Sequence, residues 1–271
     1  MMLPVTSRGV VYNQSVGILL SNLPLAHSFI PTLVKTAEDQ YEYRLYIGYD
    51  YGDSWYDNIS NWQHLSDFIR LQLKANRSGL RVTFRGIRLH AMEQRLTPVW
   101  NTLAQVAQKD QCDYFYPAND DMQLLTKGWT SAAVEALRSC PVASNFGIAA
   151  FKDVGVCMVP TFHLVHKTHL ELHGGIYYPV PSHGAGQDPW IFAVYRPWKC
   201  AFHLKQYEIK NHIGLASGPR YKYVDAPQFG RWIQRGRQEL YNRLSLSQSL
   251  YNQSFVNSSQ LNFDIVWDLP C

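Results

Sequence analysis

The sequence predicts an α/β fold with a mainly parallel central sheet flanked by helices. Short apolar segments rich in β-branched and aromatic residues alternate with segments whose apolar residues recur at helical spacing. When strands alternate with helices, right-handed crossovers make neighbouring strands parallel. The 271 residues, 46% of them hydrophobic and 17% charged, suit one large globular domain or two small ones rather than a disordered chain.

Four strands are expected in the first half of the chain, and each is a short apolar run bounded by polar or turn-forming residues. Because the carboxyl ends of parallel strands meet at one edge of a sheet, we expect a ligand to bind beyond that edge. The expected strands are 16–22 (VGILLSN), 43–50 (YRLYIGYD), 80–87 (LRVTFRGI) and 112–118 (CDYFYPA).

Helices are expected between these strands. The clearest start is at Thr97, a typical N-cap residue that is followed by Pro98 at the first helical position. The expected helices cover 61–75, 97–109 and 126–139, and a further one begins after Pro31.

The second half of the chain is less regular. Strands are expected at 146–151 and 161–167, and a short helix at 169–175 ends in glycine. A glycine-rich loop leads into a helix within 181–196, and a helix with a basic face is expected over 231–253.

We predict a single domain over residues 14–215, followed by a C-terminal extension. The composition shifts near Gly218 toward Arg, Gln, Asn, Ser and Tyr. The extension, residues 216–271, is therefore expected to be helical or irregular and to pack on the domain.

Charge and apolar patterning exclude two classes of partner. The formal net charge is +4, and no block of lysine and arginine is long enough to indicate nucleic-acid binding, although a weakly basic surface would attract an anionic small molecule. No apolar run reaches the roughly 18 residues that span a bilayer. The first residues lack the charged-then-apolar pattern of a signal peptide, so we expect a soluble, cytoplasmic protein.

Cysteines and asparagines favour different compartments. The cysteines are scattered, odd in number and form no C-x-x-C motif, which predicts reduced thiols in a cytosol-like compartment. They are Cys112, Cys140, Cys157, Cys200 and Cys271. Several asparagines lie in N-x-S sequons, which favour the secretory-pathway lumen if an anchor is missing from this chain. They are Asn13, Asn58, Asn76, Asn252 and Asn257.

Acidic residues lie at the ends of two predicted strands. Asp120 and Asp121 end the fourth strand, and Asp50 ends the second. Adjacent carboxylates repel each other, and burying them is costly unless a cation or hydrogen bonds compensate. A divalent metal would compensate, and exposure to solvent in a loop would remove the problem. Because both positions lie where ligands bind, a ligand or metal site is favoured over a solvated turn.

Four motifs within roughly residues 14 to 215 resemble those of the GT-A class of nucleotide-sugar-dependent glycosyltransferases. They are GYDYGDSWYDN (48–58), YPANDDMQL (116–124), HGGIYYPVPSHGAGQDPWIFAVYR (173–196) and IKNHIG (209–214). The resemblance implies the GT-A (Rossmann-like) form of the α/β fold and a divalent cofactor, Mn²⁺ or Mg²⁺.

The second motif resembles the acidic D-x-D motif of that class. Asp121 matches the direct metal ligand, with Asp120 beside it, and the metal would bridge the diphosphate and offset the charge on the leaving group. Asn119 replaces the usual first acid; its amide could bond the ribose or a metal-bound water, with lower metal affinity. The alternative is an acidic loop opposite Lys127 or Arg138.

The other motifs imply three further roles. Asp50 matches an acid that hydrogen-bonds the nucleotide base or ribose, although a D-x-G-D turn is commonly only a turn. Asp188 matches the general base that deprotonates the acceptor, with Gln187 where the class more often has Glu. Helix capping by Asp188 ahead of Pro189 is the alternative. His212 matches a further metal ligand; otherwise it is an ordinary polar histidine near a strand end.

Additional residues are candidates for binding the sugar donor. Ser21 and Asn22 follow the first predicted strand and would help to seat the nucleotide. Arg95 resembles an arginine that contacts the pyrophosphate, with solvated surface charge as the alternative. Trp129 either stacks on a sugar face or packs beneath the metal loop. Zinc is not expected from three histidines that cross from a strand to a helix without sharing a face: His163, His166 and His169.

We therefore predict a metal-dependent hexosyl- or pentosyltransferase that moves a sugar from a UDP- or GDP-sugar to a hydroxyl of a glycan or glycoconjugate acceptor. Asp188 as a base implies an inverting single displacement, and a retaining reaction is the weaker variant. A nucleotidyltransferase that forms such sugar donors is disfavoured, because no G-x-G loop follows the first predicted strand. A non-catalytic carbohydrate-binding protein is supported by Asn119 and Gln187, and opposed by the joint presence of Asp121, Asp188 and His212.

Overall fold

The computed structural model describes residues 1–10, 18–76, 79–90, 92, 95–155, 160–180, 186–212 and 227–247. Its strands are β1 (Met2–Val5), β2 (Glu42–Asp50), β3 (Arg81–Leu89), β4 (Tyr114–Phe115), β5 (Gln123–Leu124), β6 (Ile148–Asp153), β7 (Val165–His166) and β8 (Ala201–Lys210). Its α-helices are α1 (Ile30–Thr36), α2 (Ile59–Asn76), α3 (Leu96–Lys109), α4 (Trp129–Arg138), α5 (Thr168–Leu172), α6 (Gln187–Tyr195) and α7 (Phe229–Ser247). Shorter 3₁₀ or π turns cover Leu20–Asn22, Leu25–Phe29 and Arg196–Trp198.

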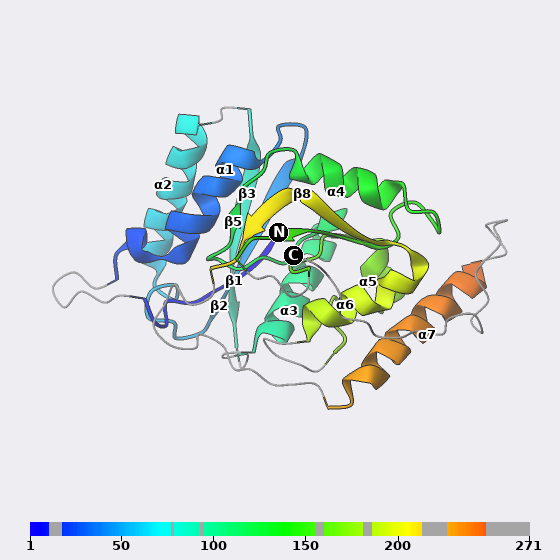
Figure 1. Cartoon of the computed structure of the whole chain (residues 1–271). Coiled ribbons are helices and arrows are strands. Elements are labelled where there is room, and N and C mark those ends of the chain that lie inside the picture. Colours follow the sequence, from blue (N-terminus) through cyan, green and yellow to red (C-terminus); the bar gives the residue numbers. More distant parts are fainter. Residues whose placement is uncertain are drawn as a thin grey trace.

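The strands form three hydrogen-bonded groups that isolated bridges join. β1, β2 and β3 are parallel, with β2 in the middle, whereas β8 lies between β6, to which it is parallel, and β5, to which it is antiparallel. β4 and β7 form an antiparallel pair. Met2 bridges to Pro117 beyond β4, and Leu164 next to β7 bridges to Ala149 in β6. The expectation of an α/β fold with a mainly parallel sheet is confirmed (Figure 1).

The first strand is not the one that the sequence analysis expected. β1 is Met2–Val5, whereas residues 18–22 of the expected strand 16–22 are irregular or form the 3₁₀ turn Leu20–Asn22. A short apolar run does not by itself distinguish a strand from a helical segment, and here Pro24 starts the turns that lead into α1. A domain that begins at residue 14 leaves out β1, which pairs with β2 on one side and bridges to Pro117 on the other.

Helices cover the sheet along its width (Figure 1). α3 packs against β1 and β2, α4 against β6 and β8, and α6 against β6. α3 runs from the carboxyl end of β3 back toward the start of β4, so its first residues lie at the carboxyl edge of the parallel strands. Every helix in the described ranges is too short or too polar to span a lipid bilayer.

The helix of the C-terminal extension, α7, packs along α6 (Figure 1). The indole N–H of Trp190 donates to the carbonyl of Trp232 at 3.0 Å, and the guanidinium of Arg237 donates to the carbonyl of Ala193 at 2.8 and 3.1 Å. Gly236 permits this approach, because an added Cβ would lie 2.9 Å from the Trp190 ring. The expected helix over 231–253 is thus observed as α7, and residues 248–253 lie outside the described ranges.

A disulfide joins Cys140, after α4, to Cys200, before β8. The expectation that the cysteines are reduced thiols is therefore wrong for this pair. The two residues are 60 positions apart and belong to no spacing motif, so no local pattern indicates that the fold brings them together. Cys112 is a free thiol, and Cys157 and Cys271 lie outside the described residues.

Candidate functional site

The carboxyl ends of β1 and β2 are joined by an ion pair. The Arg8 guanidinium, just after β1, donates to the carboxylate of Asp50 at 2.8 Å. Asp50 is the last residue of β2 and is 7% exposed. The charge of this buried carboxylate is compensated by Arg8, which lies in the loop after β1. Asp50 therefore lies where the sequence predicted, and Arg8 is a second polar group at this edge that the sequence analysis did not single out.

Asp53 fixes the loop that carries Asp50. Its carboxylate accepts hydrogen bonds from the backbone N–H and hydroxyl of Ser7 and from the hydroxyl of Thr6. It also accepts from the backbone N–H groups of Trp55 and Tyr56. Burial acts to raise the pKa of Asp53, but these hydrogen bonds outweigh it and hold the pKa below its ordinary value. Asp53 is thus a structural anchor between the loops that follow β1 and β2.

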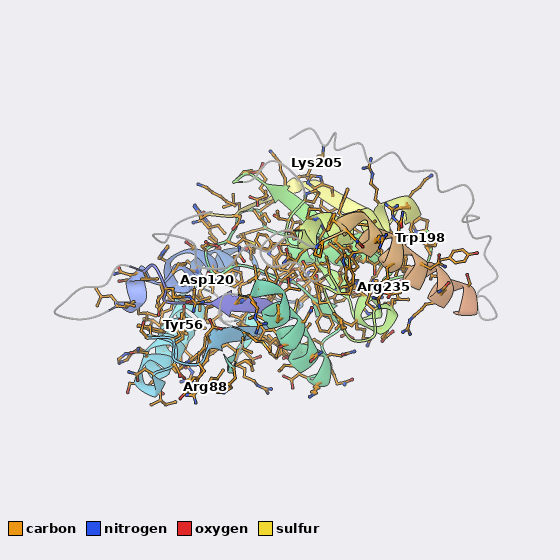
Figure 2. The ribbon with its side chains drawn as sticks, turned by 90° about the horizontal axis from the view of Figure 1, so that it is seen from below. Tyr56, Arg88, Asp120, Trp198, Lys205 and Arg235 are labelled. Carbon is orange, nitrogen blue, oxygen red and sulfur yellow. A yellow bond between two sulfur atoms is a disulfide. The ribbon has the colours of Figure 1, made fainter. Side chains whose placement is uncertain are left out.

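The two adjacent acids occupy a tight turn directly beyond β4. The backbone N–H of Met122 donates to the carbonyl of Asn119 at 3.2 Å, which places Asp120 and Asp121 at the centre of the turn. Asp120 is 1% exposed and Asp121 is 7% exposed. Figure 2 shows Asp120 at the end of the sheet toward which β1 points, the end where Tyr56 also lies. This burial contradicts the alternative of two acids that are simply solvated.

A chain of polar contacts runs from this turn to neighbouring strand ends. The amide of Asn119 lies 3.4 Å from the side-chain oxygen of Asn211, just after β8. The backbone N–H of Asn211 donates to Asp153, the last residue of β6, at 3.0 Å. The other oxygen of Asp153 accepts from the hydroxyl of Thr161 at 3.0 Å. Residues from three distant segments are therefore fixed side by side at one edge.

The chain continues from Thr161 to Asp188. The backbone N–H of Phe162 donates to Oδ1 of Asp188 at 3.2 Å, and Nδ1 of His163 lies 3.3 Å from the same oxygen. The side chain of Asp188 is 26% exposed, so an acceptor hydroxyl could reach it. Helix α6 begins at Gln187 with Gly186 as its N-cap and has no side-chain cap, so Asp188 does not cap the helix. The capping alternative is therefore wrong.

Gln187 takes a structural position. Its side-chain amide donates to the hydroxyl of Thr97, and it is 4% exposed. Thr97 lies in the first turn of α3, so this hydrogen bond fixes the start of α6 to the start of α3. The residue that differs from the usual acid of the GT-A class thus points into the protein.

Buried tyrosines surround the carboxylates. Burial raises the pKa of Tyr116 well above its ordinary value, and the negative charges of Asp153 and Asp188 add to the effect. Burial likewise raises the pKa values of Tyr177 and Tyr178, with Asp188 as the next cause. The site therefore has negative potential next to a poorly hydrated wall, a setting that favours binding of a cation.

His212 lies next to Asn211 and hence beside the acidic turn. Burial lowers the pKa of His212, positive charge at Lys210 and His27 adds to this, and Asp153 opposes it. Its Nε2 atom is buried and has no hydrogen-bond partner among the described residues. A neutral imidazole with a free nitrogen suits a divalent metal ion.

The donor set fits a metal that shares its coordination with a substrate. Within the described ranges, no group of three or more His, Cys, Asp or Glu side chains is arranged to hold a metal ion. Mg²⁺, however, is commonly bound by one or two carboxylates together with substrate phosphates. Asp121 with Asp120 offers such carboxylates, and the imidazole of His212 is of the ligand type that Mn²⁺ accepts.

Trp129 and Arg95 differ in their exposure. Trp129 is 2% exposed, and its ring lies 5.6 Å from that of Tyr116 and 5.8 Å from that of Phe151. It therefore packs beneath the strand that leads to the acidic turn, and the expectation that it stacks on a sugar face is wrong. Arg95 is exposed and directly precedes α3, at the carboxyl edge of the sheet.

Ser21 and Asn22 are not at a strand end. They form part of the 3₁₀ turn Leu20–Asn22 that precedes α1, so the reason for placing them at the nucleotide no longer holds. The residues that do follow the first strand are Thr6, Ser7 and Arg8. The zinc alternative gains no support: inside the core, Nε2 of His169 donates to the carbonyl of Tyr177, and Nδ1 forms a hydrogen bond with the hydroxyl of Tyr195.

Several residues of this site were missed because their role depends on tertiary contacts. An acid at the carboxyl end of a strand was the signal that identified Asp50, and the same signal applies to Asp153. Asn211 directly precedes His212 in a motif that had been noted. Arg8 and His163 carry no comparable signal, because each acts through a residue distant in the sequence.

Comparisons with known proteins find similarity among solved structures but none among family models or curated sequences. The sequence matches no protein-family model and no curated protein. Among solved structures, the chain is similar to the catalytic domain of Drosophila beta1,4-galactosyltransferase 7, solved in complex with xylobiose. The TM-score is 0.35 and the sequence identity 14%, over 71% of this chain and 79% of that one. We draw no functional argument from a similarity at this level.

Proposed function

We propose that the protein is a metal-dependent glycosyltransferase of GT-A fold that moves a sugar from a UDP- or GDP-sugar to an acceptor hydroxyl, on a glycan or glycoconjugate. One observation carries the proposal: hydrogen bonds and close contacts connect the buried acidic turn to Asp188 through Asn211, Asp153 and Thr161. A pair of carboxylates suited to a metal–diphosphate group and a partly exposed carboxylate suited to a base thus share one edge of the sheet.

The nucleotide would lie over the ends of β1 and β2. Asp50 offers an acceptor for an imide N–H or a ribose hydroxyl, and the ion pair with Arg8 orients that carboxylate. Arg95, at the start of α3, lies on the same edge and could approach the pyrophosphate. Asn119 would bond the ribose or a metal-bound water.

Asp121, with Asp120 and His212, would hold Mn²⁺ or Mg²⁺ against the diphosphate. The metal supplies a positive charge for the leaving group when it is bound. Backbone hydrogen bonds would keep these ligands in place: the N–H of Met122 donates to the carbonyl of Asn119 within the turn, and the N–H of Asn211, next to His212, donates to Asp153.

Asp188 would remove the proton from the acceptor hydroxyl. The backbone N–H of Phe162 donates to Oδ1 of Asp188. Oδ2 of the same carboxylate is then left to accept the proton of the acceptor hydroxyl. A base on the acceptor implies a single displacement with inversion at the anomeric carbon. A retaining reaction would instead use this carboxylate on the opposite face of the sugar.

Two other functions use the same groups differently. A nucleotidyltransferase that forms sugar nucleotides would need a basic, glycine-rich loop after the first strand; Thr6-Ser7-Arg8-Gly9 follows β1 and contains one glycine. A non-catalytic carbohydrate-binding protein would not need a carboxylate such as Asp188 connected to the acidic turn.

The disulfide, together with the N-x-S sequons, favours the secretory-pathway lumen over the cytoplasm for this activity.

The test is release of nucleotide from purified protein supplied with single UDP- and GDP-sugars, with Mn²⁺ or with EDTA. Asp121→Asn is the test variant, and Asp67→Asn, an exposed acid on α2, is the matched control. We expect release from one sugar donor that requires metal, falls at least about 100-fold in Asp121→Asn, and stays unchanged in Asp67→Asn. Absence of both release and metal-dependent nucleotide binding by calorimetry would refute the proposal.

A further inference from the structure

We propose that His163 is a positioning residue that orients the carboxylate of Asp188 toward the acceptor hydroxyl. This inference rests on the proposed function and deepens it, because it assigns a role to a residue that touches neither substrate. Nδ1 of His163 lies 3.3 Å from Oδ1 of Asp188, and the backbone N–H of Phe162 reaches the same oxygen at 3.2 Å. Two nitrogen atoms thus converge on Oδ1, and Oδ2 is left for the acceptor.

The imidazole is enclosed by the protein. His163 is 0% exposed, and its ring lies 6.5 Å from that of Phe192 on α6. Neither ring nitrogen has a well-aligned hydrogen-bond partner among the described residues. The distance from Nδ1 to Oδ1 of Asp188 is within hydrogen-bonding range, but the angle at the N–H group is not that of a hydrogen bond. A buried polar group in this state requires an explanation. Hydrogen bonds of catalytic groups are commonly long before substrate binds and shorten afterwards.

The backbone around His163 is fixed at three points. The hydroxyl of Thr161 donates to Asp153, the N–H of Phe162 donates to Asp188, and the carbonyl of His163 accepts from the hydroxyl of Tyr177. Phe162 has a φ of 51°, in the left-handed region that non-glycine residues rarely adopt. Backbone strain of this kind persists where the surroundings hold the residue, and such positions cluster at functional sites.

The proposed step conserves protons and electrons. The O–H bond of the acceptor breaks and its proton moves to Oδ2 of Asp188. The acceptor oxygen bonds to the anomeric carbon, while the bond from that carbon to the diphosphate breaks and leaves its electron pair on the diphosphate. The proton on Nδ1 of His163 stays on nitrogen throughout and donates to Oδ1, so His163 stabilises one orientation of the carboxylate.

Two variants separate positioning from packing. In His163→Asn, the side-chain amide can place an N–H near the position of Nδ1, whereas His163→Leu fills similar space without a donor. We expect His163→Leu to lower kcat about 30-fold with the KM for the sugar donor unchanged, and His163→Asn to stay within about fivefold of the wild type. Equal losses in both variants, or a loss confined to KM, would overturn the proposal.

A measurement that needs no activity tests the contact itself. Imidazole ¹⁵N NMR of the wild type should show His163 protonated at Nδ1, and Asp188→Asn should shift that signal. Protonation at Nε2 alone would overturn the positioning role even if the leucine variant failed to fold. A wild type that transfers no sugar refutes the proposed function and this role together; an active enzyme whose folded leucine variant keeps its kcat refutes this role alone.

Discussion

The guanidinium of Arg8 lies 2.8 Å from the carboxylate of Asp50, and this pair connects the ends of two parallel strands that are more than 40 residues apart in the sequence. The carboxylate side chain is 9% exposed and the guanidinium 34%, so one partner is shielded from water and the other is partly accessible. The acid that the motif identified is therefore one half of a polar pair at the expected nucleotide edge.

Arg8→Met should weaken binding of the cognate nucleotide about tenfold by calorimetry. Removing the guanidinium leaves the buried Asp50 carboxylate uncompensated, and about 1.4 kcal/mol corresponds to a factor of ten in affinity. Arg70→Met is the matched control, because Arg70 forms an exposed ion pair with Asp67 at 3.7 Å. Unchanged affinity in both variants would place the nucleotide elsewhere.

Asp53→Ala should destabilise the fold by at least about 3 kcal/mol in urea denaturation. The substitution leaves several buried hydrogen-bond donors of Thr6, Ser7 and the following loop without an acceptor, and each loss costs about 1–3 kcal/mol. Asp67→Ala, on the exposed face of α2, should change stability by less than about 0.5 kcal/mol. A similar small effect for Asp53→Ala would mean that these loops are held by other contacts.

The stability of the fold should decrease as the pH falls below about 6.5, in part through His169. Burial lowers the pKa of His169 well below its ordinary value, with the positive charge of His173 as the next cause, while a hydrogen bond to Tyr177 opposes the shift. The folded state disfavours the charged imidazole of His169. The free energy of unfolding is therefore unaffected by this group above the pKa that histidine has in the unfolded chain, and it decreases as the pH falls through and below that pKa. Denaturant titrations between pH 8 and 5 should show a smaller slope in His169→Phe; an unchanged slope would exclude this histidine as a source.

Two glycines of α7 should respond oppositely to alanine. At Gly236 an added Cβ would lie 2.8 Å from Val194 and 2.9 Å from Trp190, so Gly236→Ala should destabilise the packing of α7 on α6 by about 1–3 kcal/mol. At Gly230 nothing lies within 4 Å, so Gly230→Ala should stabilise the helix by up to about 1 kcal/mol. Thermal unfolding measures both, and equal shifts would indicate that α7 does not pack on α6 as described.

Reduction of the Cys140–Cys200 disulfide should lower the unfolding free energy by about 4 kcal/mol, the value that chain entropy gives for a bridge over 60 residues. The double variant Cys140→Ala/Cys200→Ala should show the same loss without reductant and should not respond to it. Cys112→Ser, which leaves the bridge intact, should keep its sensitivity to reductant. A wild type that is indifferent to reductant would indicate that the bridge does not form in solution.

The sequence predicted those parts of the fold that depend on local periodicity. The strands that became β2 and β3 and the helices that became α2, α3 and α4 all have apolar residues at the spacing of their structure. β1 was missed because four residues are too few to show a period. The 16–22 run was misread as a strand because apolar content without a period also fits helical turns.

Sequence analysis found candidate site residues where one residue carried the signal, and missed those whose position becomes informative only beside a distant partner. Asp50, Asp121 and Asp188 follow recognisable motifs, and the structure places each at the carboxyl edge of the sheet or in contact with that edge. His163 and Arg8 become informative only when their distant partners are known. The Cys140–Cys200 pair has the same character, because its two sulfur atoms meet only through packing of α4 on β8.

The pairing of β1 with residues far along the chain has a consequence for synthesis. Met2 exchanges backbone hydrogen bonds with Tyr116 and Ala118 at 2.9 and 3.0 Å, so β1 cannot complete its pairing during synthesis until the residues beyond β4 have followed it. At typical elongation rates this delay is roughly 10 s. During that interval the edge of β1 that does not pair with β2 is open, and a chaperone would have to protect it from pairing with another nascent chain.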